Sequence, residues 1–219
     1  MCTKYPKDLT LVTYRTQVFY FNFTYGDNDF FVMDTRGFRS RYRLPITDPS
    51  KTMLGARQLA ALKAWALDTG EGFKFIFSTV PVNTLTPVES SDAWVQYPLE
   101  REAILDFLEE HNVRNVVFLS GDLHMPFAAE LRPGVFEFGL SSIAGLVNTE
   151  NEFKTLNLSL DTGLLWQDGR WISKFGTPAS HTAMVNVDTT STPKSFTVQY
   201  FSHENEDTPT YSKTVEYRD

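Results

Sequence analysis

Short runs of apolar residues, spaced for an extended chain, recur along the whole sequence. They predict strands at residues 18–25, 30–33, 73–80, 115–120, 127–131, 135–140, 181–187, 195–201 and 211–217. The first run alternates aromatic and polar side chains, which predicts a half-buried strand. The run at 30–33 is apolar throughout and predicts a central strand, and the run at 115–120 predicts a buried one.

Two stretches between these strands repeat their apolar residues with helical spacing. Leu59 and Leu62 share one face of a helix expected at 55–69, and a second helix is expected at 99–111, after Pro98. The order strand, helix, strand, helix, strand implies parallel crossover connections in the middle of the chain. Antiparallel hairpins flank this unit, so the expected fold class is α/β shading to α+β, a layered sheet with helices outside.

We expect one domain over residues 1–219, with three further segments besides the elements above. Residues 82–97 form a loop long enough to be functional or mobile. Residues 143–180 have weak periodicity and many turn residues, so we expect an irregular excursion there. Residues 181–219 are expected to close the domain with sequential antiparallel strands.

The composition narrows the classes of partner. Hydrophobic residues make up 42% of the chain and charged residues 21%, as in ordinary globular proteins. The formal net charge is −7 and no basic run occurs, which argues against a nucleic-acid surface. No apolar run approaches membrane-spanning length, and residues 1–10 lack the apolar segment of a secretory signal. The single cysteine, Cys2, has no internal disulfide partner and indicates no compartment.

Two metal-competent side chains follow the strand expected at 115–120. Gly121 ends this strand, and Asp122 and His124 come directly after it. A carboxylate and an imidazole at the carboxyl end of a buried strand are well placed to bind a metal ion. The alternative is that Asp122 closes a turn and His124 is a partly buried histidine with a structural role, because such short motifs also arise by chance.

A second polar segment follows the strand expected at 30–33. Arg36 and Arg39 carry planar guanidinium groups, which suit bidentate binding of a phosphate or a carboxylate. Alternatively, they pair with acids on the surface of an acidic protein. Asp34, two residues before Arg36, could be a ligand, but we expect it to orient that arginine through an ion pair.

Several other polar and aromatic residues are assigned structural roles. In the loop at 82–97, Trp94 and Tyr97, near Asp92, could wall a substrate cleft, but we expect them to pin the loop to the core. Glu100 and Arg101, at the start of the second helix, are expected to form a solvated face or a capping pair. The histidines expected to be structural are His111, His181 and His203.

Three known catalytic and nucleotide-binding motifs are absent from the sequence, which excludes the reactions that depend on them. The sequence has no Gly-X-Ser-X-Gly elbow, no dinucleotide-binding glycine pattern and no Walker pattern. The remaining candidate is a metal-assisted reaction in which arginines bind an anionic group of the substrate. This combination points to hydrolysis of phosphoric esters, in which metal ions activate water and offset the charge of the phosphoryl oxygens.

Four segments together resemble one family. They read MDTRGFRS at 33–40, TMLGARQL at 52–59, DAW at 92–94 with YPLER at 97–101, and VFLSGDLH at 117–124. In this order and spacing, over residues 17–142, they resemble the PhoD-like metallophosphatases, the family of alkaline phosphatase D. The resemblance implies a calcineurin-like metallophosphoesterase fold, a two-sheet β sandwich with flanking helices and metal ions at the strand ends.

The resemblance also implies roles for individual residues. Phosphomonoesters or phosphodiesters would be hydrolysed by metal-bound water, with iron and calcium as the metals. Asp122 and His124 would be metal ligands, and Arg36 and His124 are the candidate catalytic residues. Arg36 and Arg39 would bind the phosphate of the substrate.

The chain departs from the family in its first part. Family members carry an N-terminal half with further ligand motifs, and those motifs are not found in this sequence. We therefore expect a single partial metallophosphatase domain, weakly active or inactive by itself. One alternative is a non-catalytic binding or regulatory protein that keeps half of the fold and self-associates through an exposed sheet face. Another is a carbohydrate-binding β sandwich that uses Trp94, Trp166 and Trp171.

Overall fold

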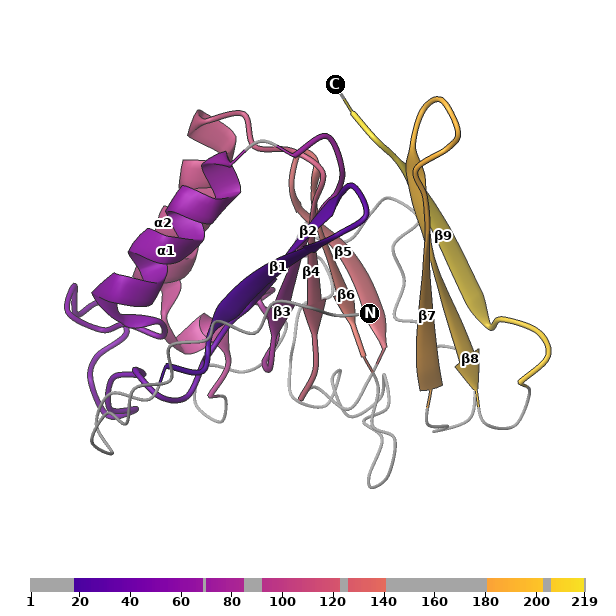
Figure 1. Cartoon of the computed structure of the whole chain (residues 1–219). Helices are drawn as coiled ribbons and strands as arrows, with labels where there is room; N and C mark the ends of the chain where they lie inside the picture. Colours follow the sequence, from indigo (N-terminus) through magenta and orange to yellow (C-terminus); the bar gives the residue numbers. More distant parts are fainter. Residues whose placement is uncertain are drawn as a thin grey trace.

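The computed structural model describes residues 18–68, 70–84, 92–122, 126–140, 181–202 and 206–218. These residues form three layers: two helices, a six-stranded mixed sheet and a three-stranded antiparallel sheet (Figure 1). The predicted irregular excursion at 143–180, with Trp166 and Trp171, lies outside the described residues, as do Cys2 and His203. Within the described part of the chain, no helix is long and apolar enough to cross a membrane.

The large sheet has a parallel centre and an antiparallel hairpin at each edge. In spatial order its strands are β1 (Phe21–Tyr25), β2 (Asn28–Val32), β3 (Lys74–Ser78), β4 (Val116–Ser120), β6 (Val135–Gly139) and β5 (Phe127–Arg132). Strands β2, β3, β4 and β6 run parallel, and β1 and β5 pair antiparallel with β2 and β6. The predicted parallel centre and flanking hairpins are both confirmed.

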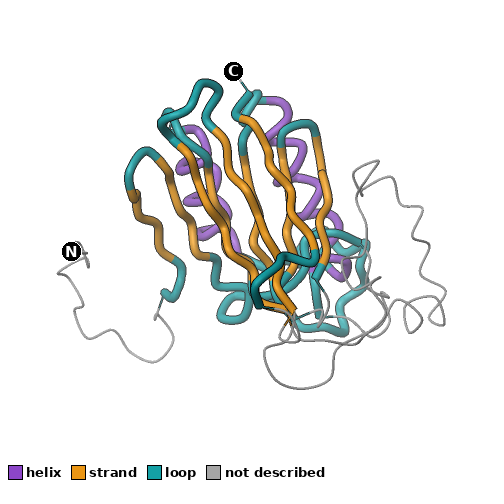
Figure 2. Tube along the Cα trace, turned by 90° about the vertical axis from the view of Figure 1, so that its right-hand side faces the viewer, coloured by secondary structure: helices purple, strands orange, loops and turns teal. Residues whose placement is uncertain are grey.

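Both helices cover the same face of this sheet. Helix α1 (Gly55–Leu67) connects β2 to β3, and helix α2 (Pro98–Glu110) connects β3 to β4 after a short 3-10 turn, η1 (Trp94–Gln96). Figure 2 shows both helices on the far side of the strands. The two predicted helices are thus confirmed, although α1 is capped by Asp68 and ends before the expected Gly70. Proline at the first position of α2 suits a helix start, where its missing N–H leaves no hydrogen bond unmade.

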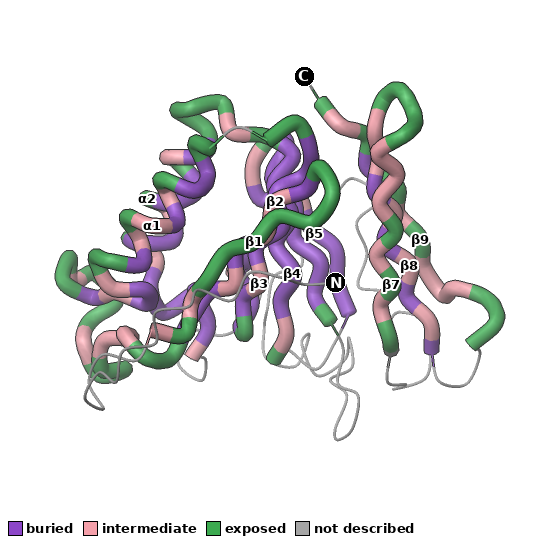
Figure 3. Tube along the Cα trace, viewed as in Figure 1, coloured by how far each residue is buried: buried purple, intermediate pink, exposed green. Residues whose placement is uncertain are grey.

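Two hydrophobic clusters lie on opposite faces of the large sheet. On the helix face, Phe31, Ile76 and Phe118 pack with side chains of α1 and α2. On the other face, Phe75 and Val117 pack with side chains of the three-stranded sheet. Neighbouring residues of one strand therefore face different layers, and the central strands are buried on both sides (Figure 3).

The last three strands form the third layer, as predicted. They are β7 (His181–Asp188), β8 (Ser195–Ser202) and β9 (Tyr211–Glu216), which pair antiparallel in chain order. On β8, Phe196, Val198 and Tyr200 are buried and alternate with partly exposed residues. The Asn115 side chain binds both the backbone N–H and the carbonyl of Arg218, which fastens the end of this layer to the start of β4.

The first strand differs from its prediction. All five residues of β1 are exposed, so the expected half-buried strand is wrong in burial, though not in its extended conformation (Figure 3). Among the described strands β1 has only β2 as a neighbour, because it forms the edge of the sheet. Its aromatic side chains therefore stack on one another and on β2, with Phe23 and Phe30 ring centroids 4.7 Å apart.

Candidate functional site

The carboxyl ends of the parallel strands meet at one edge of the large sheet. Ser78 of β3 is paired with Ser120 of β4, and Ser120 is paired with Gly139 of β6. The segments that follow lie side by side, since the Thr35 hydroxyl contacts the Thr79 hydroxyl. The polar residues that follow β2, β3 and β4 in the sequence therefore converge, as the strand order predicts.

Asp34 shapes the turn after β2. Its Oδ1 accepts hydrogen bonds from the backbone N–H groups of Arg36, at 3.0 Å, and Gly37, at 2.7 Å. The expected ion pair with the Arg36 side chain is therefore not formed. A Cβ on residue 37 would lie 2.4 Å from the other Asp34 oxygen, so a larger residue there would displace the Asp34 carboxylate. The side-chain amide of Gln58 in α1 accepts the backbone N–H of Asp34 and donates to the Asp34 carbonyl.

Arg36 and Arg39 meet at one carboxylate, that of Asp92. The Arg36 guanidinium contacts Asp92 Oδ2, and Arg39 Nη1 lies 3.1 Å from the same atom. The Arg36 side chain is 52% exposed and that of Asp92 36%. Burial would raise the pKa of Asp92, but the hydrogen bond from Arg39 and the charge of Arg36 outweigh it and hold that pKa below its ordinary value. The alternative prediction, that these arginines pair with an acid, is thus confirmed, and the shared carboxylate holds the two guanidinium groups close to each other.

Two aromatic side chains hold Asp92 in place. Trp94 and Tyr97 are each 1% exposed. The Trp94 indole N–H donates to the Ser78 hydroxyl at 3.3 Å, and the Tyr97 hydroxyl donates to the Ser40 carbonyl at 3.2 Å. Burial raises the pKa of Tyr97. The expected pinning of this loop is confirmed, and the burial of Trp94 contradicts a sugar-binding row of exposed tryptophans.

Asp122 directly follows β4, as the sequence indicates. It is exposed and has a positive φ of 72°, a conformation that few residues other than glycine adopt but that aspartate tolerates. Its predicted co-ligand, His124, lies outside the described residues. Among the residues that the structure describes, no three or more His, Cys, Asp or Glu side chains form a metal-binding group. A carboxylate oxygen is a suitable ligand for calcium, and a carboxylate together with an imidazole is suitable for iron.

Glu100 and Arg101 do not form a solvated face. Glu100 is 8% exposed, and its Oε2 accepts the backbone N–H groups of Met53, at 2.6 Å, and Leu54, at 3.1 Å. A carboxylate of α2 therefore binds the two residues that precede α1, a partner that lies far away in the sequence. The predicted capping pair is not formed, since neither α1 nor α2 has a side-chain hydrogen bond at its N-cap, and this distant partner could not be read from the residues around Glu100. His111, which was expected to have a structural role, is the C-cap of α2.

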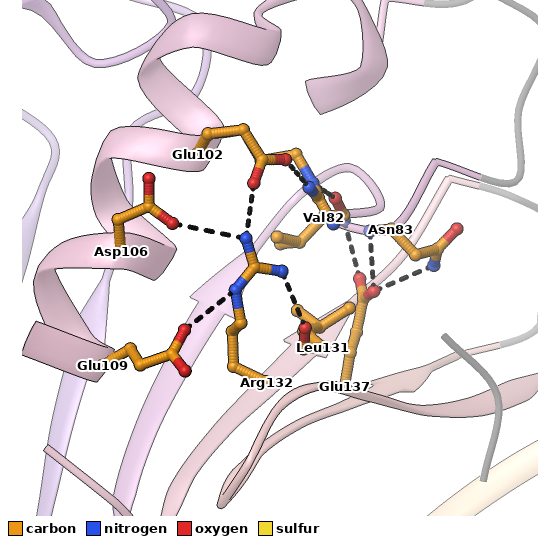
Figure 4. A network of polar contacts seen from close by, with 9 residues as sticks. Val82, Asn83, Glu102, Asp106, Glu109, Leu131, Arg132 and Glu137 are labelled. Atoms are coloured by element: carbon orange, nitrogen blue, oxygen red, sulfur yellow. Dashed lines mark hydrogen bonds and ion pairs between the residues drawn. The ribbon is translucent and has the colours of Figure 1, made fainter. Parts of the chain in front are cut away.

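Glu137 in the middle of β6 is a site residue that sequence reasoning missed. It is fully buried and accepts hydrogen bonds from Val82 N, at 2.7 Å, and from Asn83 N and Nδ2, both at 2.8 Å (Figure 4). A fourth hydrogen bond comes from Ser120 Oγ, at 2.7 Å. Burial raises the pKa of Glu137, and these hydrogen bonds act against that rise. A glutamate inside an otherwise apolar strand is the signal that could have revealed it.

Comparisons with known proteins point to one family. The family model described as PhoD-like phosphatase matches residues 7–166. Alkaline phosphatase D of Bacillus subtilis (strain 168) is 34% identical over 146 residues, which cover 58% of this chain and 24% of that protein. The chain thus spans about a quarter of the length of this curated relative.

Solved structures show the same fold. The structure of PhoD has a TM-score of 0.63 at 20% identity and covers 92% of this chain and 41% of its own. Purple acid phosphatase PPD1 from yellow lupin seeds has a TM-score of 0.52 at 11% identity and covers 90% of this chain and 32% of its own. The fold is therefore metallophosphoesterase-like, and because the family model matches most of its length, this chain belongs to the PhoD-like phosphatase family.

Proposed function

We propose that this chain serves the hydrolysis of phosphoric esters, monoesters or diesters, at the carboxyl edge of its parallel strands. The observation that carries the proposal is the convergence, in a PhoD-like chain, of two arginines on one carboxylate beside the end of the strand that presents Asp122. Anion binding and metal binding are thereby expected at neighbouring strand ends of one sheet.

The arginines are the proposed phosphate ligands. Arg36 is the more exposed of the two, and its guanidinium can offer a pair of N–H donors to phosphoryl oxygens. Arg39 is more buried and also donates to the Asp92 carbonyl at 3.1 Å, so it fixes Asp92 as much as it binds an anion. Asp92 thus keeps both cations at one place before substrate arrives.

Asp122 and His124 are the proposed metal ligands, with iron and calcium as the proposed metals. When bound, such an ion supplies a Lewis acid for the phosphoryl group and a nucleophilic water at neutral pH. Arg36 and His124 are the side chains proposed to touch the reacting phosphate. Two protein ligands are fewer than the three that a catalytic zinc ion usually takes, so we expect little turnover from the 219-residue chain alone.

Metal and phosphate binding test this proposal without depending on turnover. Calorimetry with calcium, with iron and with inorganic phosphate should show metal binding that is lost in Asp122→Ala and in His124→Ala. The matched controls are Asp207→Ala, in the turn before β9, and His111→Ala, at the end of α2; both should bind like the wild type.

The outcomes are distinct. A folded wild-type chain that binds neither metal nor phosphate would overturn the proposed site. Hydrolysis of a chromogenic phosphodiester that disappears in Asp122→Ala would support the function and show that the expected weak activity of the single chain is wrong.

The exposed first strand favours a second candidate, a binding protein that self-associates. Phe19, Phe21, Phe23 and Tyr25 lie two residues apart and are 63%, 52%, 40% and 78% exposed. Strand β1 also lacks the charges and prolines that usually protect a sheet edge. Sedimentation should show a concentration-dependent dimer that Phe21→Lys abolishes. A wild type that is monomeric at high concentration would contradict this candidate.

A further inference from the structure

The buried carboxylate of Glu137 joins two segments that approach the phosphate-binding edge from different strands. Ser120 is the last residue of β4 and precedes the Gly121-Asp122 turn. Val82 and Asn83 follow β3, and the residue before them, Pro81, accepts the backbone N–H of Trp94 at 3.3 Å, two residues after Asp92. We call these four residues, Glu137, Ser120, Val82 and Asn83, the Glu137 clamp. Figure 4 shows Glu137 with Val82 and Asn83.

Helix α2 holds the same peptide from the other side. The Arg101 Nε–H donates to the carbonyl of Val82, whose own N–H donates to Glu137. Arg101 is 3% exposed and also contacts Glu102, whose second oxygen lies 2.6 Å from Arg132 Nη2. The Val82 peptide is therefore fixed between a buried anion on β6 and a buried cation on α2.

An apolar residue would fill this place at less energetic cost. Taking a carboxylate out of water is expensive, and replacing a buried charge by well-packed apolar side chains is often neutral or stabilising. The clamp has a geometric effect that an apolar residue lacks, because hydrogen bonds to a carboxylate have set lengths and directions. It fixes the distance between the end of β4 and the segment that follows β3.

We infer that Glu137 is a positioning residue, which holds the Asp122 turn and the Asp92-bearing segment in register with each other. Its hydrogen-bonding role follows from the contacts alone. Its effect on ligands rests on the proposed function, in which Asp122 binds a metal and Asp92 holds Arg36 and Arg39 for phosphate.

The donors around Glu137 make its isosteric amide a sharp test. Oε1 accepts the backbone N–H of Val82, and Oε2 accepts the backbone N–H of Asn83. Backbone N–H groups cannot turn around to become acceptors. In Glu137→Gln the side-chain NH₂ therefore faces one of these two N–H groups in either orientation, so the segment after β3 loses one of its two backbone hydrogen bonds although the shape of the side chain is kept.

Hydrogen exchange and phosphate calorimetry on the full chain separate the two parts of this inference. In Glu137→Gln the backbone amide of Val82 or of Asn83 should exchange about tenfold faster. Inorganic phosphate and calcium should bind about tenfold more weakly, as is usual when an outer partner of a ligand is lost. The matched control is Glu130→Gln on the neighbouring strand β5, whose carboxylate binds Gly134 N at 3.0 Å near the opposite edge.

Each result decides one point. Unchanged exchange at both amides in a folded Glu137→Gln protein overturns the clamp, and faster exchange with unchanged ligand affinities overturns its positioning role. A wild type that binds no ligand overturns the proposed function, while the exchange data still decide the clamp. If Glu137→Gln fails to fold, Ser120→Ala and Asn83→Ala each remove one side-chain donor and keep both backbone donors, and each should weaken phosphate binding by a smaller factor.

Discussion

Two ionic groups lie near the same edge of the large sheet and differ in how much water reaches them. Glu137 and Arg101 are 0% and 3% exposed, and both bind backbone groups of Val82. Arg36 and Asp92 are 52% and 36% exposed and pair with each other. A buried charge needs hydrogen-bond partners inside the protein, and binding them fixes the backbone. An exposed ion pair is weak, so its charges can exchange their partner for a ligand.

The largest expected effect is on the buried group. Glu137→Ala removes the acceptor of four hydrogen bonds and leaves Arg101 buried without this opposite charge nearby. Breaking a buried ionic network costs about 3–5 kcal/mol in the free energy of unfolding. Urea denaturation should show this loss, whereas Glu130→Ala on β5 should change stability by much less. Equal losses in the two variants would mean that burial does not distinguish these carboxylates.

Glu100 extends the comparison to a second buried carboxylate. Glu100→Ala leaves the amides of Met53 and Leu54 without their acceptor at the start of α1. Hydrogen bonds to charged groups contribute about 1.5–3 kcal/mol, so a loss of this size is expected by thermal denaturation. The control is Glu110→Ala, an exposed residue at the end of α2. A loss under about 0.5 kcal/mol, the range of ordinary surface substitutions, would contradict this anchoring role of Glu100.

The exposed group should affect binding rather than stability. Arg36→Ala should weaken phosphate binding about tenfold, equal to about 1.4 kcal/mol, because a phosphoryl group loses its most accessible guanidinium. The free energy of unfolding should change by less than about 1 kcal/mol, since exposed ion pairs are screened by water. Arg43→Ala, in the exposed loop after β2, is the control. A large loss of stability without loss of affinity would reverse the comparison.

The smallest expected effect is the acid response of Asp92. Its folded pKa lies below the ordinary value, so its stabilising contribution is present above the unfolded pKa and is lost as pH falls through the folded pKa. The stability difference between the wild type and Asp92→Asn should therefore stay constant from pH 7 to about pH 5 and shrink only below about pH 4. A difference that already shrinks between pH 7 and pH 6 would contradict the ion pairs with Arg36 and Arg39.

Local signals predicted most of the secondary structure. The periodicity of α1 and α2 and the continuous apolar runs of β2 and β4 placed these elements to within a few residues. The same strand order predicted that Asp34, Arg36 and Asp122 follow strands that end at one edge. These predictions succeed because side-chain periodicity and parallel crossovers follow from chain geometry alone.

Other features depend on neighbours that are distant in the sequence. The alternation in β1 predicts one buried face, but the strand lies at an edge, so its aromatic residues are exposed. Asp92 is separated from Arg36 by 56 residues, and nothing in either segment indicates their pairing. The interaction of Glu100 with the start of α1 likewise spans 47 residues.

The sequence by itself determined the parallel α/β centre, the family and the order in which polar residues follow the strands. Periodicity, turn residues and ordered motifs are local properties, so they can be read before the chain is folded. Only the tertiary structure decided which charges are buried and which backbone groups they bind. The physical reason is that the energy of a charge depends on the water and the dipoles around it, and for Glu137 those dipoles come from β4 and from the segment after β3.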